Sequence, residues 1–157
     1  AGLLSPARMH HTTRDKLAGL IRPAGYYNIK AVRLKNFTDM LFSKYGGSLS
    51  LMSRQGVSRL RDELLGVNGI GPETCDSILL YAFNKPVFVI DAYTKRVFSR
   101  HKYFSEETPY HEAQRYFSTS IPKDARIYNE YHALIVNLAK EHCKKRRLCV
   151  DCPIASM

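Results

Sequence analysis

Apolar residues recur at intervals of three and four along most of the chain, and polar residues separate them. This spacing is that of one buried face of an α-helix. It predicts helices over residues 14–21, 28–45, 57–65, 72–83, 91–100, 109–118 and 124–142. No alternating strand pattern is longer than the run Val87–Ile90. The sequence therefore predicts an all-α protein.

Local signals mark where these helices begin and end. Thr13 is a capping residue before the first helix, and Pro23 ends it. The pair Gly46 and Gly47 ends the second helix, and Pro72 begins the fourth. The spacing also predicts core residues, among them Ile29, Val32, Cys75, Ala82 and Leu134. On a buried helix face, Cys75 is expected to be an inert core thiol.

The charge of the chain narrows the class of partner. Its 157 residues include 24 Lys and Arg against 14 Asp and Glu, a formal net charge of +10. Such a surplus attracts polyanions, although ribosomal, membrane-surface and nucleic-acid proteins all share it. No window approaches the roughly 20 apolar residues that span a bilayer. We expect a soluble, intracellular, cytoplasmic protein, associated with the nucleoid if it is bacterial.

A glycine-rich turn between two predicted helices is the first candidate binding site. It runs from Val67 to Gly71, and Pro72 starts the helix that follows. Gly69 and Gly71 are expected to take positive φ and to let a ligand approach the backbone. Free amides at a helix start bind phosphate, and Ile70 would anchor the turn in the core. The alternative is a structural helix–helix turn that binds nothing.

Asp91 is the candidate carboxylate. It follows the apolar run Val87–Ile90 and precedes a predicted helix, so it is expected to cap that helix. A carboxylate held by backbone amides stays ionised and can face a developing cation. The structural role and the chemical role are therefore compatible.

The order of these features resembles a known family. The turn at Val67–Gly71, then Val89, Ile90 and Asp91, and then a C-terminal cysteine cluster resemble the helix-hairpin-helix DNA glycosylases of the endonuclease III superfamily. The segments 21–31 and 69–74 look most like the branch that contains 3-methyladenine DNA glycosylase III. The likeness covers nearly the whole chain.

The resemblance implies a fold and a domain organisation. It implies an all-α, two-lobe helix-hairpin-helix glycosylase fold, with a six-helix lobe and a C-terminal helical lobe of the iron-sulfur type. We place the six-helix lobe at residues 1–86, with the helix-hairpin-helix at about 57–83, and the second lobe at residues 87–157. Relative to the family, the N-terminus looks truncated.

The resemblance also implies site residues. Asp91 matches the essential carboxylate, and Lys140 lies where the alkyladenine branch has a basic residue near the site. Glu73 occupies the position of the lysine that attacks the sugar in bifunctional members, and a glutamate cannot form a Schiff base. The expected DNA contacts are Asn68, Gly69, Ile70, Gly71, Thr74, Lys144, Lys145, Arg146 and Arg147.

Three cysteines close together suggest a metal centre. Cys143, Cys149 and Cys152 resemble the first three ligands of the [4Fe–4S] cluster of the family, and the fourth would fall at position 158. Thiolates at this spacing suit iron–sulfur or zinc binding, and zinc held with His142 or free thiols are the alternatives. The basic run 144–147 would form a loop able to bind phosphate.

The expected activity is that of a monofunctional DNA N-glycosylase. It would act as a monomer on double-stranded DNA, flip out an alkylated purine and hydrolyse the N-glycosidic bond. A bifunctional endonuclease III-like glycosylase and lyase for oxidised pyrimidines is one alternative. A DNA-binding fragment without catalysis is the other.

Overall fold

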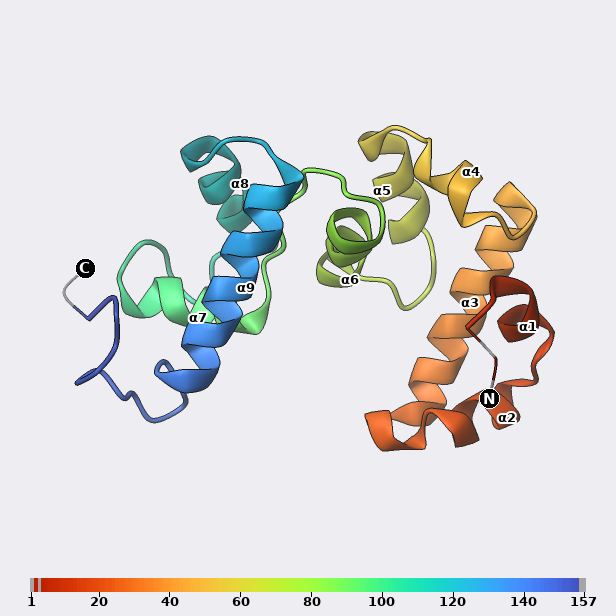
Figure 1. Cartoon of the computed structure of the whole chain (residues 1–157), viewed down its shortest axis with the longest axis horizontal. Coiled ribbons are helices and arrows are strands. Elements are labelled where there is room, and N and C mark those ends of the chain that lie inside the picture. The colour runs from red at the N-terminus through yellow and green to blue at the C-terminus, as the bar shows by residue number, and fades with distance from the viewer. Residues whose placement is uncertain (1, 3, 156–157) are drawn as a thin grey trace. The chain divides into compact units, whose positions relative to one another are not determined.

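The computed structural model describes residue 2 and residues 4–155, which form helices joined by turns (Figure 1). In chain order these are α1 (Pro6–His11), α2 (Arg14–Leu20), η1 (Arg22–Ala24), α3 (Tyr27–Tyr45), α4 (Leu49–Ser53), α5 (Val57–Leu65), α6 (Pro72–Ser77), η2 (Ile78–Ala82), α7 (Ala92–Arg100), α8 (Tyr110–Ser120) and α9 (Ala125–Glu141). Within this described part no β-strand forms, and one isolated bridge joins Cys143 and Arg147. The all-α prediction is confirmed.

Every helix expected from the spacing is present, and the largest difference in an end is at α8, which extends to Ser120. Helices α1 and α4 were not predicted, because their six and five residues are too short to show a repeating apolar stripe. None of the described helices is both long and apolar enough to cross a membrane.

The chain divides into two compact units, Ala1–Gly71 and Pro72–Met157. The boundary falls at the end of the glycine-rich turn, so α5 belongs to the first unit and α6 to the second. Each unit is defined by the close packing of its own residues with one another. The lobe boundary expected at residue 86 stays a prediction.

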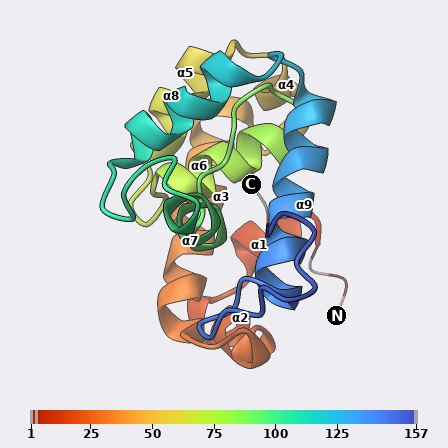
Figure 2. The ribbon, with the colours of Figure 1, turned by 90° about the vertical axis from the view of Figure 1, so that its left-hand side faces the viewer.

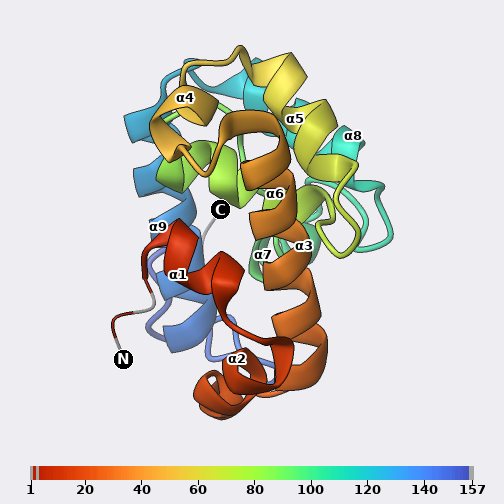
Figure 3. The same cartoon turned by 90° about the vertical axis from the view of Figure 1, so that its right-hand side faces the viewer.

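In the first unit, α1 and α2 pack against the long helix α3 (Figure 3). Leu17 and Ala18 of α2 meet Ala31 of α3 in a small core. The prediction that Ile29 and Val32 lie in the core is wrong, since these residues are 54% and 37% exposed. The buried positions of α3 are Ala31, Thr38, Leu41 and Tyr45. The apolar residues of α3 thus do not all follow its buried face.

In the second unit, α7 packs against α9, as Figure 2 shows. Their common core is largely aromatic: the rings of Phe88 and Phe117 stack at 4.1 Å, and Tyr128 meets Phe88 edge-on at 5.3 Å. Phe88, Val89 and Ile90 are all buried, which explains why this run is continuously apolar. Burial of these large side chains fixes the backbone just before Asp91.

The helix that begins at Pro72 changes its geometry part-way along. After Ser77 it continues as a π-helix, η2, whose wider turn rotates the following side chains relative to an α-helix. Leu80 is therefore buried, and Ala82, expected in the core, is exposed. Cys75 is fully buried, as predicted. In α9 the expectation for Leu134 is also wrong, because that residue is 56% exposed.

Candidate active site

Asp91 is the N-cap of α7, as the sequence predicts. Its Oδ1 accepts a hydrogen bond of 2.7 Å from the backbone amide of Thr94. The backbone before it is held in place, since the amide of Ile90 donates to the Tyr110 hydroxyl at 3.3 Å. Only 14% of the Asp91 side chain is exposed. The hydrogen bond from Thr94 therefore fixes the direction of a largely buried carboxylate.

His132 of α9 lies against the same carboxylate and was not among the residues predicted for the site. Its Nε2 is 3.6 Å from Oδ2 of Asp91, and its side chain is 9% exposed. Its Nδ1 is 2.5 Å from the hydroxyl of Tyr81 in η2. A sequence signal for it exists, because His132 stands on the buried stripe of α9 with Tyr128, Ile135 and Ala139. A histidine on an otherwise apolar stripe indicates a buried polar contact.

These contacts determine the protonation state of the Asp91 carboxyl group. Burial works to raise the pKa of Asp91, but the neighbouring imidazole of His132 and the hydrogen bond from Thr94 more than offset it, and the pKa is lowered. Burial, and then the negative charge of Asp91, raise the pKa of Tyr81. The arrangement holds an ionised carboxylate beside a protonated phenol.

Glu73 lies in the first turn of α6 and belongs to the same electrostatic neighbourhood. Burial raises its pKa first, the charge of Asp91 raises it further, and His132 opposes both. The position that the resemblance assigns to the nucleophilic lysine is thus close enough to Asp91 for the two carboxyl groups to interact. Neither carboxyl group can form a Schiff base.

The glycine-rich turn is held by α3 within the first unit. Asn36 donates to the backbone oxygen of Asn68 at 2.9 Å. Gly69 has a φ of +97°, and a Cβ at this position would lie 2.3 Å from Cγ of Arg33. Ile70 is buried, as predicted.

Two details of the turn differ from expectation. Gly71 is not among the described glycines with positive φ, and a Cβ there would meet nothing within 4 Å. The amide of Ile70 is used inside the turn, where it donates to the oxygen of Val67 at 3.0 Å, so it is not a free donor. A phosphate contact of this turn would therefore use backbone donors other than the amide of Ile70.

The basic residues near the C-terminus are all exposed. Lys144, Lys145, Arg146 and Arg147 lie on the loop after α9, and Lys140 lies near the end of α9 itself. Arg100 of α7 shapes this loop by donating to the backbone oxygens of Lys144 and Lys145 at 2.6 and 3.1 Å. Lys140 follows His132 by eight residues, about 12 Å along the helix axis. Its expected role beside Asp91 stays a prediction.

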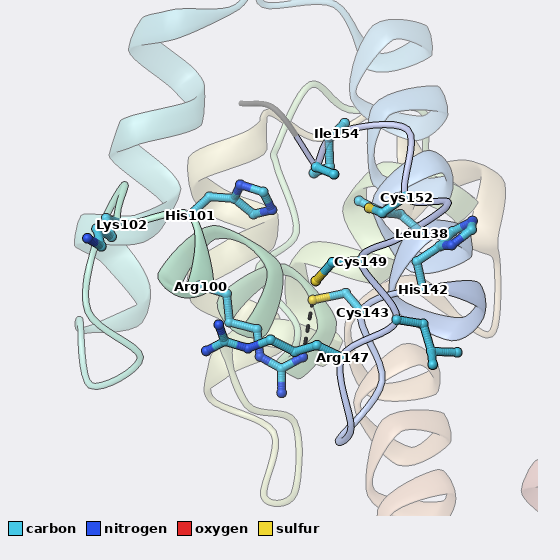
Figure 4. A pocket seen from close by; sticks show the side chains of 12 residues that line it. Arg100, His101, Lys102, Leu138, His142, Cys143, Arg147, Cys149, Cys152 and Ile154 are labelled. Atoms are coloured by element: carbon cyan, nitrogen blue, oxygen red, sulfur yellow. Dashed lines mark hydrogen bonds between the residues drawn. The ribbon is translucent and has the colours of Figure 1, made fainter.

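The three clustered cysteines line one cavity of about 380 Å³, together with His142 and Arg100 (Figure 4). Arg100 approaches Sγ of Cys143 at 3.3 Å, and the thiols of Cys143 and Cys149 face one another. In the described residues, no group of three or more His, Cys, Asp or Glu side chains is arranged to hold a metal ion. The described residues supply three thiols here and do not complete a four-ligand cluster site.

The comparisons with known proteins agree with this geometry. Residues 2–123 match the HhH-GPD superfamily of base excision DNA repair proteins. The chain belongs to this superfamily. A protein of Methanocaldococcus jannaschii with the provisional name DNA repair glycosylase is 48% identical over 97% of the chain, which spans 70% of that relative.

Solved structures confirm the helix-hairpin-helix glycosylase fold. A non-covalent endonuclease III–DNA complex matches with a TM-score of 0.80 at 26% identity, covering 96% of this chain and 66% of the other. The H. pylori 3-methyladenine DNA glycosylase bound to 1,N6-ethenoadenine matches with a TM-score of 0.75 at 28% identity, covering 87% and 67%. The chain thus spans about two thirds of the length of these two structures.

Proposed function

We propose that the protein is a monofunctional DNA N-glycosylase that releases alkylated purines from double-stranded DNA. The observation that carries the proposal is Asp91, an ionised and nearly buried carboxylate held by Thr94 and His132. Membership in a base excision repair superfamily supports DNA as the substrate. The charge of +10 supports binding to its phosphates.

In this reaction the damaged nucleotide is turned out of the duplex before chemistry begins. The bond between C1′ of the sugar and the base nitrogen breaks, and its electron pair leaves with the base. The sugar develops positive charge, which the Asp91 carboxylate stabilises. A water molecule then adds to C1′ and transfers its proton to Asp91.

Alkylated purines are the proposed substrates because they already carry a positive charge. Such a base leaves as a neutral molecule, so the enzyme needs little acid catalysis. Glu73 fits this class, since a carboxyl group in place of the lysine cannot form the Schiff base with the sugar that a bifunctional enzyme needs. The similarity to a 3-methyladenine DNA glycosylase points the same way.

Two other functions compete with this one. Similarity to endonuclease III favours a bifunctional enzyme for oxidised pyrimidines, but Glu73 argues against it. A DNA-binding protein without catalysis would keep the glycine-rich turn and the basic loop 144–147. A [4Fe–4S] cluster bound by Cys143, Cys149 and Cys152 stays a prediction for either enzyme.

One assay separates the three functions. Duplexes containing 3-methyladenine or thymine glycol are incubated with the purified protein, and strand breaks are measured with and without alkali. We expect base release from 3-methyladenine, seen as breaks only after alkali. Breaks without alkali would overturn the monofunctional proposal, and binding without release from either duplex would leave the non-catalytic one.

A further inference from the structure

His132 is buried and joins two groups that come from different elements of the second unit. Its Nδ1 contacts the hydroxyl of Tyr81 at 2.5 Å, and its Nε2 points toward Oδ2 of Asp91 at 3.6 Å. Its Nε2 has no hydrogen-bond partner among the described residues. A buried polar atom without a partner is costly, so its direction toward Asp91 needs a reason.

The contact between Tyr81 and Nδ1 bears on which nitrogen of the imidazole carries the proton. Burial and the charge of Asp91 raise the pKa of Tyr81, so its hydroxyl keeps its proton near neutral pH and is able to donate to Nδ1 at 2.5 Å. A neutral imidazole that accepts at Nδ1 carries its hydrogen on Nε2. That hydrogen then faces Oδ2 of Asp91.

Two other ionisable groups of the second unit interact with this contact. α9 packs against α7 and η2, and the negative charge of Asp91 helps to raise the pKa values of Tyr81 in η2 and of Glu73 in α6. The cations of α7 are engaged elsewhere: Lys95 donates to the backbone oxygen of Thr108, and Arg96 donates to those of Ala139 and Cys143. On another side, the ring of Phe88 lies 6.3 Å from the imidazole.

We propose that His132 is a positioning residue for the reaction, with Tyr81 fixing its tautomer so that Nε2–H holds Oδ2 of Asp91. Oδ1 is held by Thr94 and Oδ2 by His132, so the carboxylate has one orientation toward the sugar. The separation of 3.6 Å is longer than a hydrogen bond, and such contacts tighten when a substrate binds. This inference rests on the proposed function.

Removal of the His132 donor should change the pH dependence of base release in one direction. A donor to the ionised carboxylate favours that form, so its removal raises the pKa of Asp91. In His132→Phe we expect the acidic limb of the rate profile to move to higher pH, and base release at neutral pH to fall about tenfold, the usual effect of losing one hydrogen bond to a charged group. His132→Gln keeps an N–H donor and should restore part of both.

Tyr81→Phe tests the tautomer separately. Without the phenol, the imidazole can carry its hydrogen on Nδ1 and turn a lone pair toward Asp91, so the acidic limb should move in the same direction by a smaller amount. Tyr128→Phe is the matched control, because Tyr128 is a buried tyrosine one turn before His132 on α9. Tyr128→Phe should leave the acidic limb of the rate profile unchanged.

A second measurement keeps the inference separate from the proposed function. The Asp91 carboxyl carbon is titrated by NMR in the wild-type protein and in the variants, which requires no catalysis. A higher pKa of Asp91 in His132→Phe and Tyr81→Phe, but not in Tyr128→Phe, supports the inference even if no base is released. An unchanged titration of Asp91 in a folded His132→Phe protein overturns it, whatever the wild-type activity.

Discussion

Gln114 of α8 donates its side-chain amide to Oδ2 of Asp76 at 2.7 Å, and Asp76 is fully buried. The same amide nitrogen donates to the backbone oxygen of Phe88 at 2.6 Å. One side chain therefore links α6 to the apolar run that precedes Asp91. The backbone that leads to the candidate carboxylate Asp91 is therefore held by this polar contact as well as by aromatic packing.

Gln114→Leu should destabilise the protein by about 1–3 kcal/mol, because it removes one donor from a buried carboxylate and one from a buried carbonyl. Thermal or denaturant unfolding measures the loss. Gln55→Leu is the control, since Gln55 makes an exposed hydrogen bond to the backbone of Leu51. Its effect should stay within about 0.5 kcal/mol. Equal effects at both positions would contradict the linking role of Gln114.

The glycine-rich turn offers a pair of substitutions with opposite expectations. Gly69→Ala places a Cβ at a φ of +97° and against Arg33, and should cost about 1–3 kcal/mol of stability. Gly71→Ala meets open space and no positive φ, so stability should change little. If DNA approaches this backbone, Gly71→Ala should nevertheless weaken binding to a duplex in fluorescence anisotropy. Unchanged affinity in Gly71→Ala would remove Gly71 from the DNA contact surface.

Much of this fold could be predicted from the sequence because its signals are local. A few neighbouring residues determine the local geometry at the caps Thr13 and Asp91, at the turn at Gly69 and in the continuous apolar run before Asp91. The helix spacing gave most of the remaining elements. A signal confined to one turn of chain does not depend on how the units pack.

What escaped prediction depends on packing between distant residues. Tyr81 and His132 are 51 residues apart, and their contact needs the π-helical turn at η2, which no spacing rule indicates. After the same turn Ala82, which was expected in the core, is exposed, and Leu80 is buried. His132 stood on a predicted helix face, but only the fold shows that this face meets Asp91.

The stability of the protein should depend on pH through Asp91. The pKa of Asp91 is lowered in the folded state. Its stabilising effect is therefore complete above the pKa that the Asp91 carboxyl has in the unfolded chain. The effect is lost as pH falls through the lower, folded value. Asn is an equally good cap, so Asp91→Asn keeps the cap but removes this ionisation. The stability difference between wild type and variant should therefore shrink in acid, and a difference that is constant with pH would contradict the contacts of Asp91.

Glu73→Lys tests the proposed reason for monofunctional chemistry. It places an amine in the first turn of α6, near the Asp91 carboxylate that interacts with the native glutamate. A lysine there can attack C1′ and form a Schiff base. We expect the variant to gain strand cleavage without alkali and covalent trapping by borohydride, with Glu73→Gln as the inactive control. Trapping of the wild-type protein would show that another amine already performs this step.

In the proposed reaction, the Asp91 carboxylate stabilises the positive charge on the sugar during base release. The most direct test is the single-turnover rate of 3-methyladenine release by wild type and Asp91→Asn, together with the Kd of each for the same duplex. We predict a loss of about 100-fold or more in rate and a Kd within about threefold of wild type, since the cap is preserved. Equal rates of release by the two proteins would contradict the account.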